Sequence, residues 1–311
     1  MTGRAFALRA VGLVLVLVGC ESGGGPSGVP GAVFGGMTQG LTGVNPADAR
    51  TATTDIDEPE EIELGRAVTT ALGSRYTLLR DEPLTRYVAL VGNAVAVQSD
   101  RPDLHYYFGV LDTDEINAFA APGGYVLVTR GTLALMRDEA ALAGVLGHEV
   151  GHVALRHHNE TIKEERQSAL KKAGFLSLTQ IGLGFAHVGG AGDVALHTFA
   201  PIALKAGADT TFSALLKGHS RKEEGEADGV GFKYAARAGY DPAGLRDFLQ
   251  AVQESGKQPA KSGLFAKWAS THPGTDDRLK EQETLLKAQP AGGRRAAARF
   301  QQAMAAVPAA R

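Results

Sequence analysis

Apolar residues recur at helical spacing in two early segments of the chain, residues 59–72 and 84–97. This spacing predicts two helices with one apolar face each. Two shorter segments, residues 106–111 and 125–129, are typical of strands, and a Pro-Gly-Gly turn precedes the second. Asp138 is well placed to cap a long helix that follows it. The pattern therefore predicts an α+β fold, in which helices cover a small sheet.

The N-terminal segment has the pattern of a signal peptide. Arg4 and Arg9 precede and flank an apolar run over residues 10–18, which is too short to span a bilayer. The run ends in Leu-Val-Gly-Cys, which resembles a bacterial lipobox; this implies that residues 1–19 are a signal peptide and that Cys20 is acylated. Cys20 is the only cysteine in the chain, so an internal disulfide is excluded. The alternative is an ordinary secretory signal that leaves a stray cysteine.

Composition then suggests how the rest of the chain is organised. Gly, Ser and Pro are frequent after Cys20, and we interpret residues 20–50 as a flexible tether. We expect a single domain over residues 51–290 and a C-terminal tail over residues 291–311. The 311 residues are 44% apolar and carry a net charge of −2, which suits a well-packed core and gives no case for nucleic acid. Nothing recurs at a period of about 34 residues, so helical repeats are not expected.

The strongest chemical signal is the stretch His148-Glu149-Val150-Gly151-His152. Residues four apart share one face of a helix, so both imidazoles can reach one metal ion. Glu149 lies about 100° further round the helix than His148, where it can face a metal-activated water without being a ligand. This spacing is typical of zinc metalloproteases, in which the glutamate is the general base.

A third ligand could come from a histidine soon after this motif. His158 lies six residues after His152, as in the metzincin pattern. That pattern needs a turning glycine at the position of Leu155, which we interpret as a helix-interior residue. It also needs a downstream methionine turn, and Met304 near the chain end is the only methionine that follows. We therefore disfavour a metzincin.

A second source is a helix that we expect to open after Ser220 and to run to about residue 238, with Gly239 as its stop signal. Glu224 and Asp228 lie four apart on this helix and share a face. One of them can bind zinc while the other orients a ligand histidine.

Four ordered motifs now resemble a single family. They are the His-Glu-x-x-His helix, the Ser-Arg-x-x-Glu-x-x-Ala-Asp stretch at residues 220–228, the Asn-Ala-Phe-Ala-x-Pro-Gly-Gly region that starts at residue 117, and Ser-x-His-Pro at residues 270–273. The resemblance spans residues 55–288. It is to the gluzincin metalloendopeptidases that include the CAAX prenyl endoprotease, HtpX and the periplasmic proteases BepA and LoiP. The chain is similar to a minimal, LoiP-like lipoprotein member without helical repeats.

The resemblance implies a zincin-like fold with one zinc ion held by His148, His152 and Glu224. It implies that Asp228 orients a ligand. It also gives His272 a supporting catalytic role, either as a fourth ligand at rest or as a stabiliser of the transition state.

Other residues receive weaker roles. A zincin substrate typically lies extended along an edge strand, and the candidate edge consists of Asn117, Ala118, Phe119 and Ala120. His105 receives no role. The remaining histidines are expected at the surface or around the ligands: His157, His158, His187, His197 and His219.

Residues 161–217 are rich in Gly, Ala, Leu and Phe. Their apolar run at residues 173–190 is short and contains Gln180, His187 and five glycines, so a transmembrane span is disfavoured. We expect a helical hairpin near the active-site cleft, which touches the membrane surface or gates access.

We therefore expect a zinc metalloendopeptidase that cleaves misfolded cell-envelope proteins in extended conformation. Cys20 would anchor it to the membrane, and Glu21 in the next position resembles the pattern of lipoproteins sorted to the periplasmic face of the outer membrane. One alternative is an assembly chaperone that uses zinc without proteolysis, although a purely structural site would need no base such as Glu149. Another is a prenyl-peptide protease, disfavoured because the many transmembrane helices of those relatives are missing.

Overall fold

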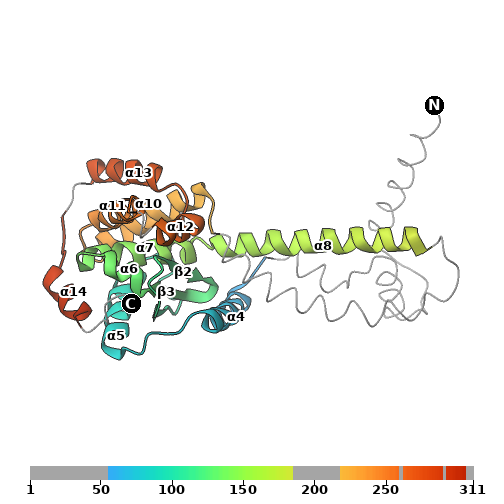
Figure 1. Ribbon diagram of the computed structural model, residues 1–311, viewed down its shortest axis with the longest axis horizontal. Coiled ribbons are helices and arrows are strands. Elements are labelled where there is room, and N and C mark those ends of the chain that lie inside the picture. The colour runs from blue at the N-terminus through green and yellow to red at the C-terminus, as the bar shows by residue number, and fades with distance from the viewer. Residues whose placement is uncertain (1–54, 185–217, 259–261, 290–291, 306–311) are drawn as a thin grey trace.

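The computed structural model describes residues 55–184, 218–258, 262–289 and 292–305 (Figure 1). Its elements, in chain order, are α4 (Glu58–Arg75), α5 (Glu82–Ala96), β1 (Tyr107–Leu111), β2 (Ala118–Ala121), η1 (Pro122–Gly124), β3 (Tyr125–Thr129), α6 (Arg130–Leu135), α7 (Glu139–Ala154), α8 (His157–Gly184), α10 (Arg221–Arg237), α11 (Ala243–Gly256), α12 (Ser262–Thr271), α13 (Thr275–Ala288) and α14 (Ala297–Met304). The α+β prediction of helices over a small sheet is confirmed. The expected signal peptide, tether and Cys20 lie outside the described residues, as do His187 and His197.

The sheet has three strands in the order β1-β3-β2. β1 pairs with β3 in parallel, and β2 pairs with β3 antiparallel, with Ala118 opposite Val128 and Ala121 opposite Tyr125. The tight connection between β2 and β3 is η1, where Gly123 has a φ of 72° that suits glycine. β2 is therefore an edge strand, as the sequence predicts for this segment.

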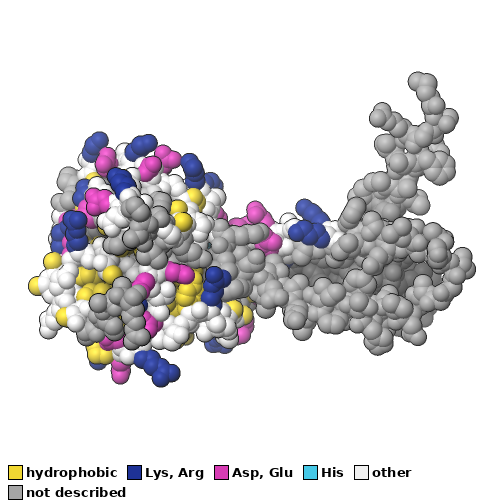
Figure 2. All heavy atoms as spheres, viewed as in Figure 1, with side chains coloured by type: hydrophobic (Ala, Val, Ile, Leu, Met, Phe, Trp, Pro, Cys, Tyr) yellow, Lys and Arg dark blue, Asp and Glu magenta, His cyan; other side chains and the backbone are white. Residues whose placement is uncertain are grey.

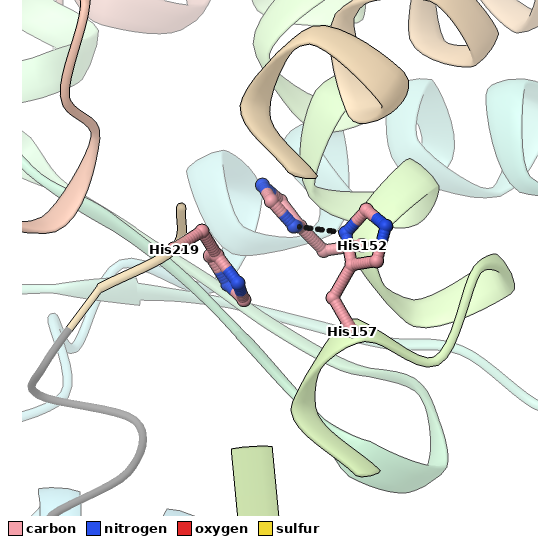
Figure 3. A group of neighbouring side chains, drawn as sticks. All are labelled: His152, His157 and His219. Carbon is pink, nitrogen blue, oxygen red and sulfur yellow. Dashed lines mark hydrogen bonds between the residues drawn. The ribbon is translucent and has the colours of Figure 1, made fainter. Parts of the chain in front are cut away.

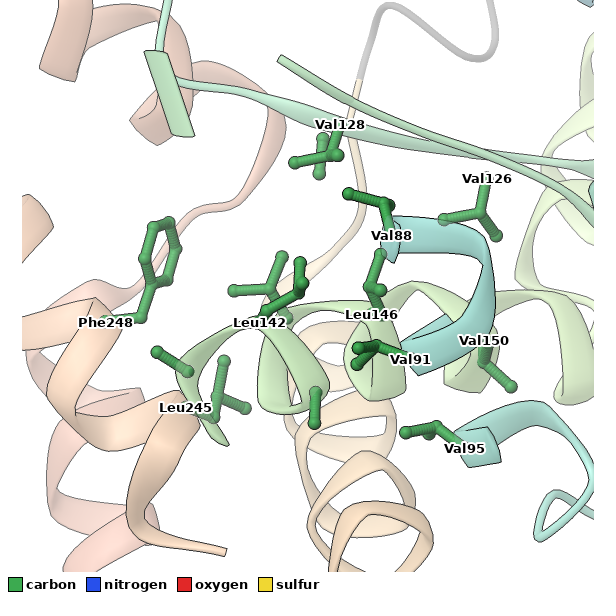
Figure 4. Packing of buried hydrophobic residues seen from close by; sticks show 14 of the residues in the cluster. Val88, Val91, Val95, Val126, Val128, Leu142, Leu146, Val150, Leu245 and Phe248 are labelled. Atoms are coloured by element: carbon green, nitrogen blue, oxygen red, sulfur yellow. The ribbon is translucent and has the colours of Figure 1, made fainter. Parts of the chain in front are cut away.

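Helix α7 forms the centre of the molecule. Asp138 caps it, as expected, by accepting a hydrogen bond from the Ala141 amide at 2.9 Å. Every residue of α7 from Glu139 to Val153 is buried, between α5, α10, α11 and the sheet. Figure 4 shows Leu142, Leu146 and Val150 of α7 among side chains from α5, β3 and α11. A helix that is buried all round holds its polar residues rigidly, and these include both motif histidines.

The close contact between α7 and α10 depends on two glycines. A Cβ at Gly231 would lie 2.7 Å from the His148 amide nitrogen, and one at Gly147 would lie 2.9 Å from the Gly231 carbonyl oxygen. Neither helix could approach the other as closely with a side chain at these positions. The glycines thus bring the acidic residues of α10 against the histidines of α7.

Replacing Gly231 by alanine should therefore separate the two helices. We expect a loss of about 1–3 kcal/mol in the free energy of unfolding, the usual cost of overpacking. Gly229→Ala is the matched control on the same helix, because nothing lies within 4 Å of its added Cβ. That change should stabilise the protein by about 0.5–1 kcal/mol through helix propensity. Urea denaturation measures both, and equal stability of the two variants would contradict the packing argument.

The C-terminal segment corrects the expected domain boundary. Residues 292–305 do not form a separate tail: Phe300 of α14 is 1% exposed within the main core. Arg299 pairs with the buried carboxylate of Glu139, which also accepts hydrogen bonds from Tyr87 and Tyr240. The last described helix thus fixes the N-terminal end of α7, a tertiary contact that composition alone does not indicate.

Helix α8 extends away from the body of the molecule (Figure 1). It covers the first part of the expected helical hairpin, and the rest lies outside the described residues. Within the ranges described, no helix is long and apolar enough to cross a membrane. The visible face of the body mixes acidic, basic and hydrophobic side chains (Figure 2).

Candidate metal centre

Three candidate ligands meet where α7 contacts α10. The Nε2 atoms of His148 and His152 lie 3.1 Å apart. The Glu224 carboxylate faces both, with Oε2 3.7 Å from His148 Nε2 and Oε1 3.3 Å from His152 Nε2. One ligand atom from each residue lies within 4.8 Å of the other two, close enough for all three to bind one ion. All three residues are fully buried. The structure thus brings together the three residues that the sequence motifs suggested.

Their donor set and geometry fit zinc. Two imidazole nitrogens and one carboxylate oxygen are the ligands of many catalytic zinc sites, and two nitrogens on one tetrahedral ion lie about 3.3 Å apart. Glu224 Oε1 has no hydrogen-bond partner, although it is buried. A buried acceptor without a donor is costly unless a cation is bound. The arrangement is therefore that of an open, three-ligand metal site.

Asp228 and Arg278 form hydrogen bonds with the candidate ligands His148 and Glu224. Asp228 Oδ1 lies 2.8 Å from His148 Nδ1, so the carboxylate accepts that proton and leaves Nε2 free to bind a metal. Arg278 on α13 donates to both oxygens of Asp228 at 2.7 and 2.8 Å, and to Glu224 Oε2 at 2.5 Å. The carboxylates of Glu149, Glu224 and Asp228 are all buried, and Arg278 is the guanidinium that faces them. A divalent cation would neutralise the excess of two negative charges.

The pKa shifts follow from burial and these charges. Burial and Arg278 lower the pKa of His148, but Glu224 and Asp228 outweigh them and raise it above its ordinary 6.5. Burial alone would raise the pKa of Asp228, but Arg278 and His148 hold it well below its ordinary value. Asp228 is therefore an anion that accepts hydrogen bonds throughout the physiological range.

Glu149 faces His272 and also lies within 4.8 Å of a ring nitrogen of His148. Its Oε1 lies 3.4 Å from His272 Nε2 and has no hydrogen-bond partner. Burial would raise the pKa of Glu149, but His272 and the other histidines lower it overall, so the carboxylate is ionised. A buried, ionised carboxylate beside a metal site has the position and charge of a general base.

His272 is held in place on two sides. Its ring stacks on Trp268, with centroids 4.1 Å apart, and its Nδ1 lies 2.9 Å from Thr271 Oγ. Thr271 in turn donates to Asn117 Oδ1 at 3.0 Å, which links His272 to the start of the edge strand. The Ser-x-His-Pro segment therefore lies at the site, as its motif suggested.

Further histidines surround His152 (Figure 3). His219 stacks on the His152 ring with centroids 3.8 Å apart, and His157 Nδ1 lies 2.8 Å from His152 Nδ1. His158 lies behind them, 4.5 Å from the His219 ring. Burial lowers the pKa of all four, that of His158 to about 4. These rings are therefore neutral. The sequence left open whether His157, His158 and His219 lie at the surface or around the ligands, and all three lie around His152.

The structure excludes the metzincin alternative because of the position of His158, although it does not confirm the expectation for Leu155. Leu155 is not a helix-interior residue: it caps α7 and is 37% exposed, so that interpretation was wrong. The chain does turn here, at Arg156, without a glycine. His158 nevertheless stays outside the group that can hold a metal with His148 and His152. Met304 lies in α14, which contacts α5 and α7.

Two residues of the site carry no strong sequence signal. Arg278 lies in a helix of charged residues, where an arginine normally faces solvent, yet it is 2% exposed. Trp268 is fully buried against His272 and Phe248. The burial of Arg278 depends on its contacts with the distant helix α10, and that of Trp268 depends on its packing against Phe248 of α11.

The fold and the site define the class of the protein: a zincin-like metallopeptidase domain. A model of peptidase family M48 matches residues 83–285, and the chain belongs to this family. The beta-barrel assembly-enhancing protease of Yersinia pestis is 28% identical over 233 residues, which are 74% of this chain and 44% of that protein. The corresponding protein of Escherichia coli K12 is 26% identical over 225 residues, 71% of this chain and 43% of that protein.

A mitochondrial relative is similar over a comparable stretch. The mitochondrial metalloendopeptidase OMA1 of Schizosaccharomyces pombe is 31% identical over 204 residues, which are 66% of this chain and 53% of that protein. The chain thus spans about half the length of the curated relatives that it matches.

Proposed function

We propose that the protein is a zinc-dependent metalloendopeptidase that hydrolyses internal peptide bonds. The observation that supports this most is the convergence of His148, His152 and Glu224 beside an ionised Glu149. Such a site has three protein ligands and an open position, as catalytic zinc sites do. A closed structural site would have a fourth ligand in place of a free base.

The mechanism assigns one task to each residue. When bound, zinc would supply Lewis acidity, which lowers the pKa of a water molecule and polarises a carbonyl group. Glu149 takes the proton of the attacking water and then passes it to the leaving amine. Asp228 keeps His148 in the tautomer that binds metal through Nε2. His272, held by Trp268, would donate a hydrogen bond to the developing oxyanion in its doubly protonated form, or occupy the fourth position at rest through an unprotonated Nε2.

We propose that the substrate binds along the edge strand β2. β2 packs against α7, and its residues Ala118, Phe119 and Ala120, which Asn117 directly precedes, run along the edge of the sheet. An extended polypeptide could add to this edge through main-chain hydrogen bonds. We propose misfolded cell-envelope proteins as substrates, in line with the resemblance to envelope proteases. Acylation of Cys20 would anchor the enzyme at the periplasmic face of the outer membrane, and membrane fractionation of a Cys20→Ser variant tests this anchor.

Metal removal tests the proposed function. Stripping the purified protein with a chelator should abolish cleavage of an unfolded substrate such as casein, and one equivalent of zinc should restore it. Two outcomes would contradict the proposal. Full cleavage by protein verified to be zinc-free would exclude a metal mechanism. Zinc-loaded protein that suppresses aggregation of a denatured substrate without cleaving it would instead support a chaperone.

A further inference from the structure

The two ligand histidines have different partners at Nδ1. His148 Nδ1 faces the Asp228 carboxylate at 2.8 Å. His152 Nδ1 faces His157 Nδ1, also at 2.8 Å, and Figure 3 shows the hydrogen bond that joins the two rings. Asp228 belongs to the Ser-Arg-x-x-Glu-x-x-Ala-Asp stretch of α10, whereas His157 lies outside all four sequence motifs.

The chain must turn for His157 to reach this position. In an uninterrupted helix, a residue five positions after His152 would lie about 140° further round and face away from it. Arg156 adopts a left-handed conformation, with φ of 58°, which ends α7 and starts α8 at His157. Such a conformation is unfavourable for a residue with a Cβ. The turn returns the His157 ring to the buried face of His152.

We infer that His157 is a positioning residue for the metal site: it accepts the Nδ1 proton of His152 and thereby presents His152 Nε2 to the metal. This inference rests on the proposed function. Of the two Nδ1 atoms, only one can carry the shared proton. A metal on His152 Nε2 requires that proton on His152, so His157 must accept it and carry its own proton on Nε2.

The surroundings of His157 match this assignment. Its Nε2 lies 3.4 Å from Glu226 Oε2, a carboxylate that can take the second proton. His152 thus donates to His157, which faces Glu226 with its Nε2 proton, just as His148 donates directly to Asp228. Groups that orient a metal ligand in this way typically change metal affinity 10- to 100-fold when removed, by the general rule for such partners.

The same histidines could instead hold a second ion, since His152, His157 and His219 also cluster closely. The distances favour a hydrogen bond. Two nitrogens on one tetrahedral ion lie about 3.3 Å apart, which is close to the 3.1 Å between the Nε2 atoms of His148 and His152 but longer than the 2.8 Å between His152 and His157. His152 would also have to bind two metals through one ring.

Three variants test the inference. His157→Phe keeps the ring volume and removes the acceptor, whereas His157→Asn places an amide oxygen near the former Nδ1. His158→Phe is the matched control, because His158 is equally buried but its ring centroid lies 6.2 Å from that of His152. Zinc affinity is measured by competition with a chromogenic chelator on the full chain, with zinc stoichiometry and the visible spectrum of the cobalt-substituted protein as further readouts.

We expect His157→Phe to weaken zinc binding about 10- to 100-fold and to alter the cobalt spectrum. His157→Asn should stay within a few-fold of the wild type, as should His158→Phe. Unchanged affinity in His157→Phe, or equal losses in the Phe and Asn variants, would overturn the inference. Two zinc equivalents in the wild type that fall to one in His157→Phe would also overturn it, in favour of a second metal site. Failure of the wild type to bind zinc at all would instead refute the proposed function.

Discussion

Replacing Glu149 by glutamine is expected to lower the rate of proteolysis about 10²- to 10⁴-fold, the usual contribution of a general base. Zinc should stay bound, because the proposed ligands are His148, His152 and Glu224, and the substitution changes none of them. The amide has nearly the same size as the carboxylate but cannot take a proton from water. It also removes one of three buried negative charges, so the metal-free protein should be no less stable than the wild type.

The measurement pairs kcat for an unfolded substrate with the zinc content of the same sample. Glu160→Gln is the control, because this glutamate lies exposed on α8, and it should leave both quantities unchanged. Glu149 also clusters with His148 and His272 in a group that could hold a metal. Loss of zinc in Glu149→Gln would show that the ion binds there and would contradict the ligand assignment.

Replacing Arg278 by methionine should have the largest effect on stability. The guanidinium is almost fully buried and is the charge that balances Asp228 and Glu224. Without it, Glu224 and Asp228 lose the three hydrogen bonds from Arg278, Asp228 keeps only the one from His148, and both carboxylates stay in a low-dielectric environment. Breaking a buried ion pair from one side typically costs about 3–5 kcal/mol, and we expect this loss in the free energy of unfolding of the metal-free protein.

Two further variants test whether the loss of stability in Arg278→Met comes from the buried charge and its hydrogen bonds. Arg278→Lys keeps the charge but cannot form the two parallel hydrogen bonds to Asp228, so it should recover only part of the loss. Arg221→Met removes an exposed arginine that pairs with Asp277 at 3.3 Å, and it should change stability by less than about 0.5 kcal/mol. Urea denaturation in excess chelator compares them. Equal stability of Arg278→Met and Arg221→Met would mean that Arg278 does not stabilise the buried carboxylates of Asp228 and Glu224, contrary to the prediction.

Elements defined by local signals could be predicted from the sequence. Asp138 caps α7 because its side chain reaches the third amide after it, which depends on nearby residues alone. Ser220 opens α10 through a capping box with Glu223, again a local device. The helix spacing of His148 and His152 fixes their common face, and the motif of α10 indicated Glu224.

The rest depends on contacts between distant segments. Arg278 is buried only because α13 packs against α10, and no local pattern distinguishes it from its exposed neighbours. The turn at Arg156 uses a conformation that is typical of glycine, so the sequence suggested a continuing helix through Leu155. The packing of α14 on the N-terminus of α7 joins residues about 160 positions apart, which composition cannot indicate.

The central claim is that a zinc site with Glu149 as its base hydrolyses internal peptide bonds. Mass spectrometry of an unfolded protein digested in ¹⁸O-water tests it most directly, with wild type and Glu149→Gln compared at equal zinc content. Hydrolysis by the wild type should yield internal fragments whose new C-terminal carboxyl groups carry ¹⁸O, and the variant should yield almost none. Fully zinc-loaded wild type that produces no labelled fragments, or a variant that produces them equally fast, would contradict the account.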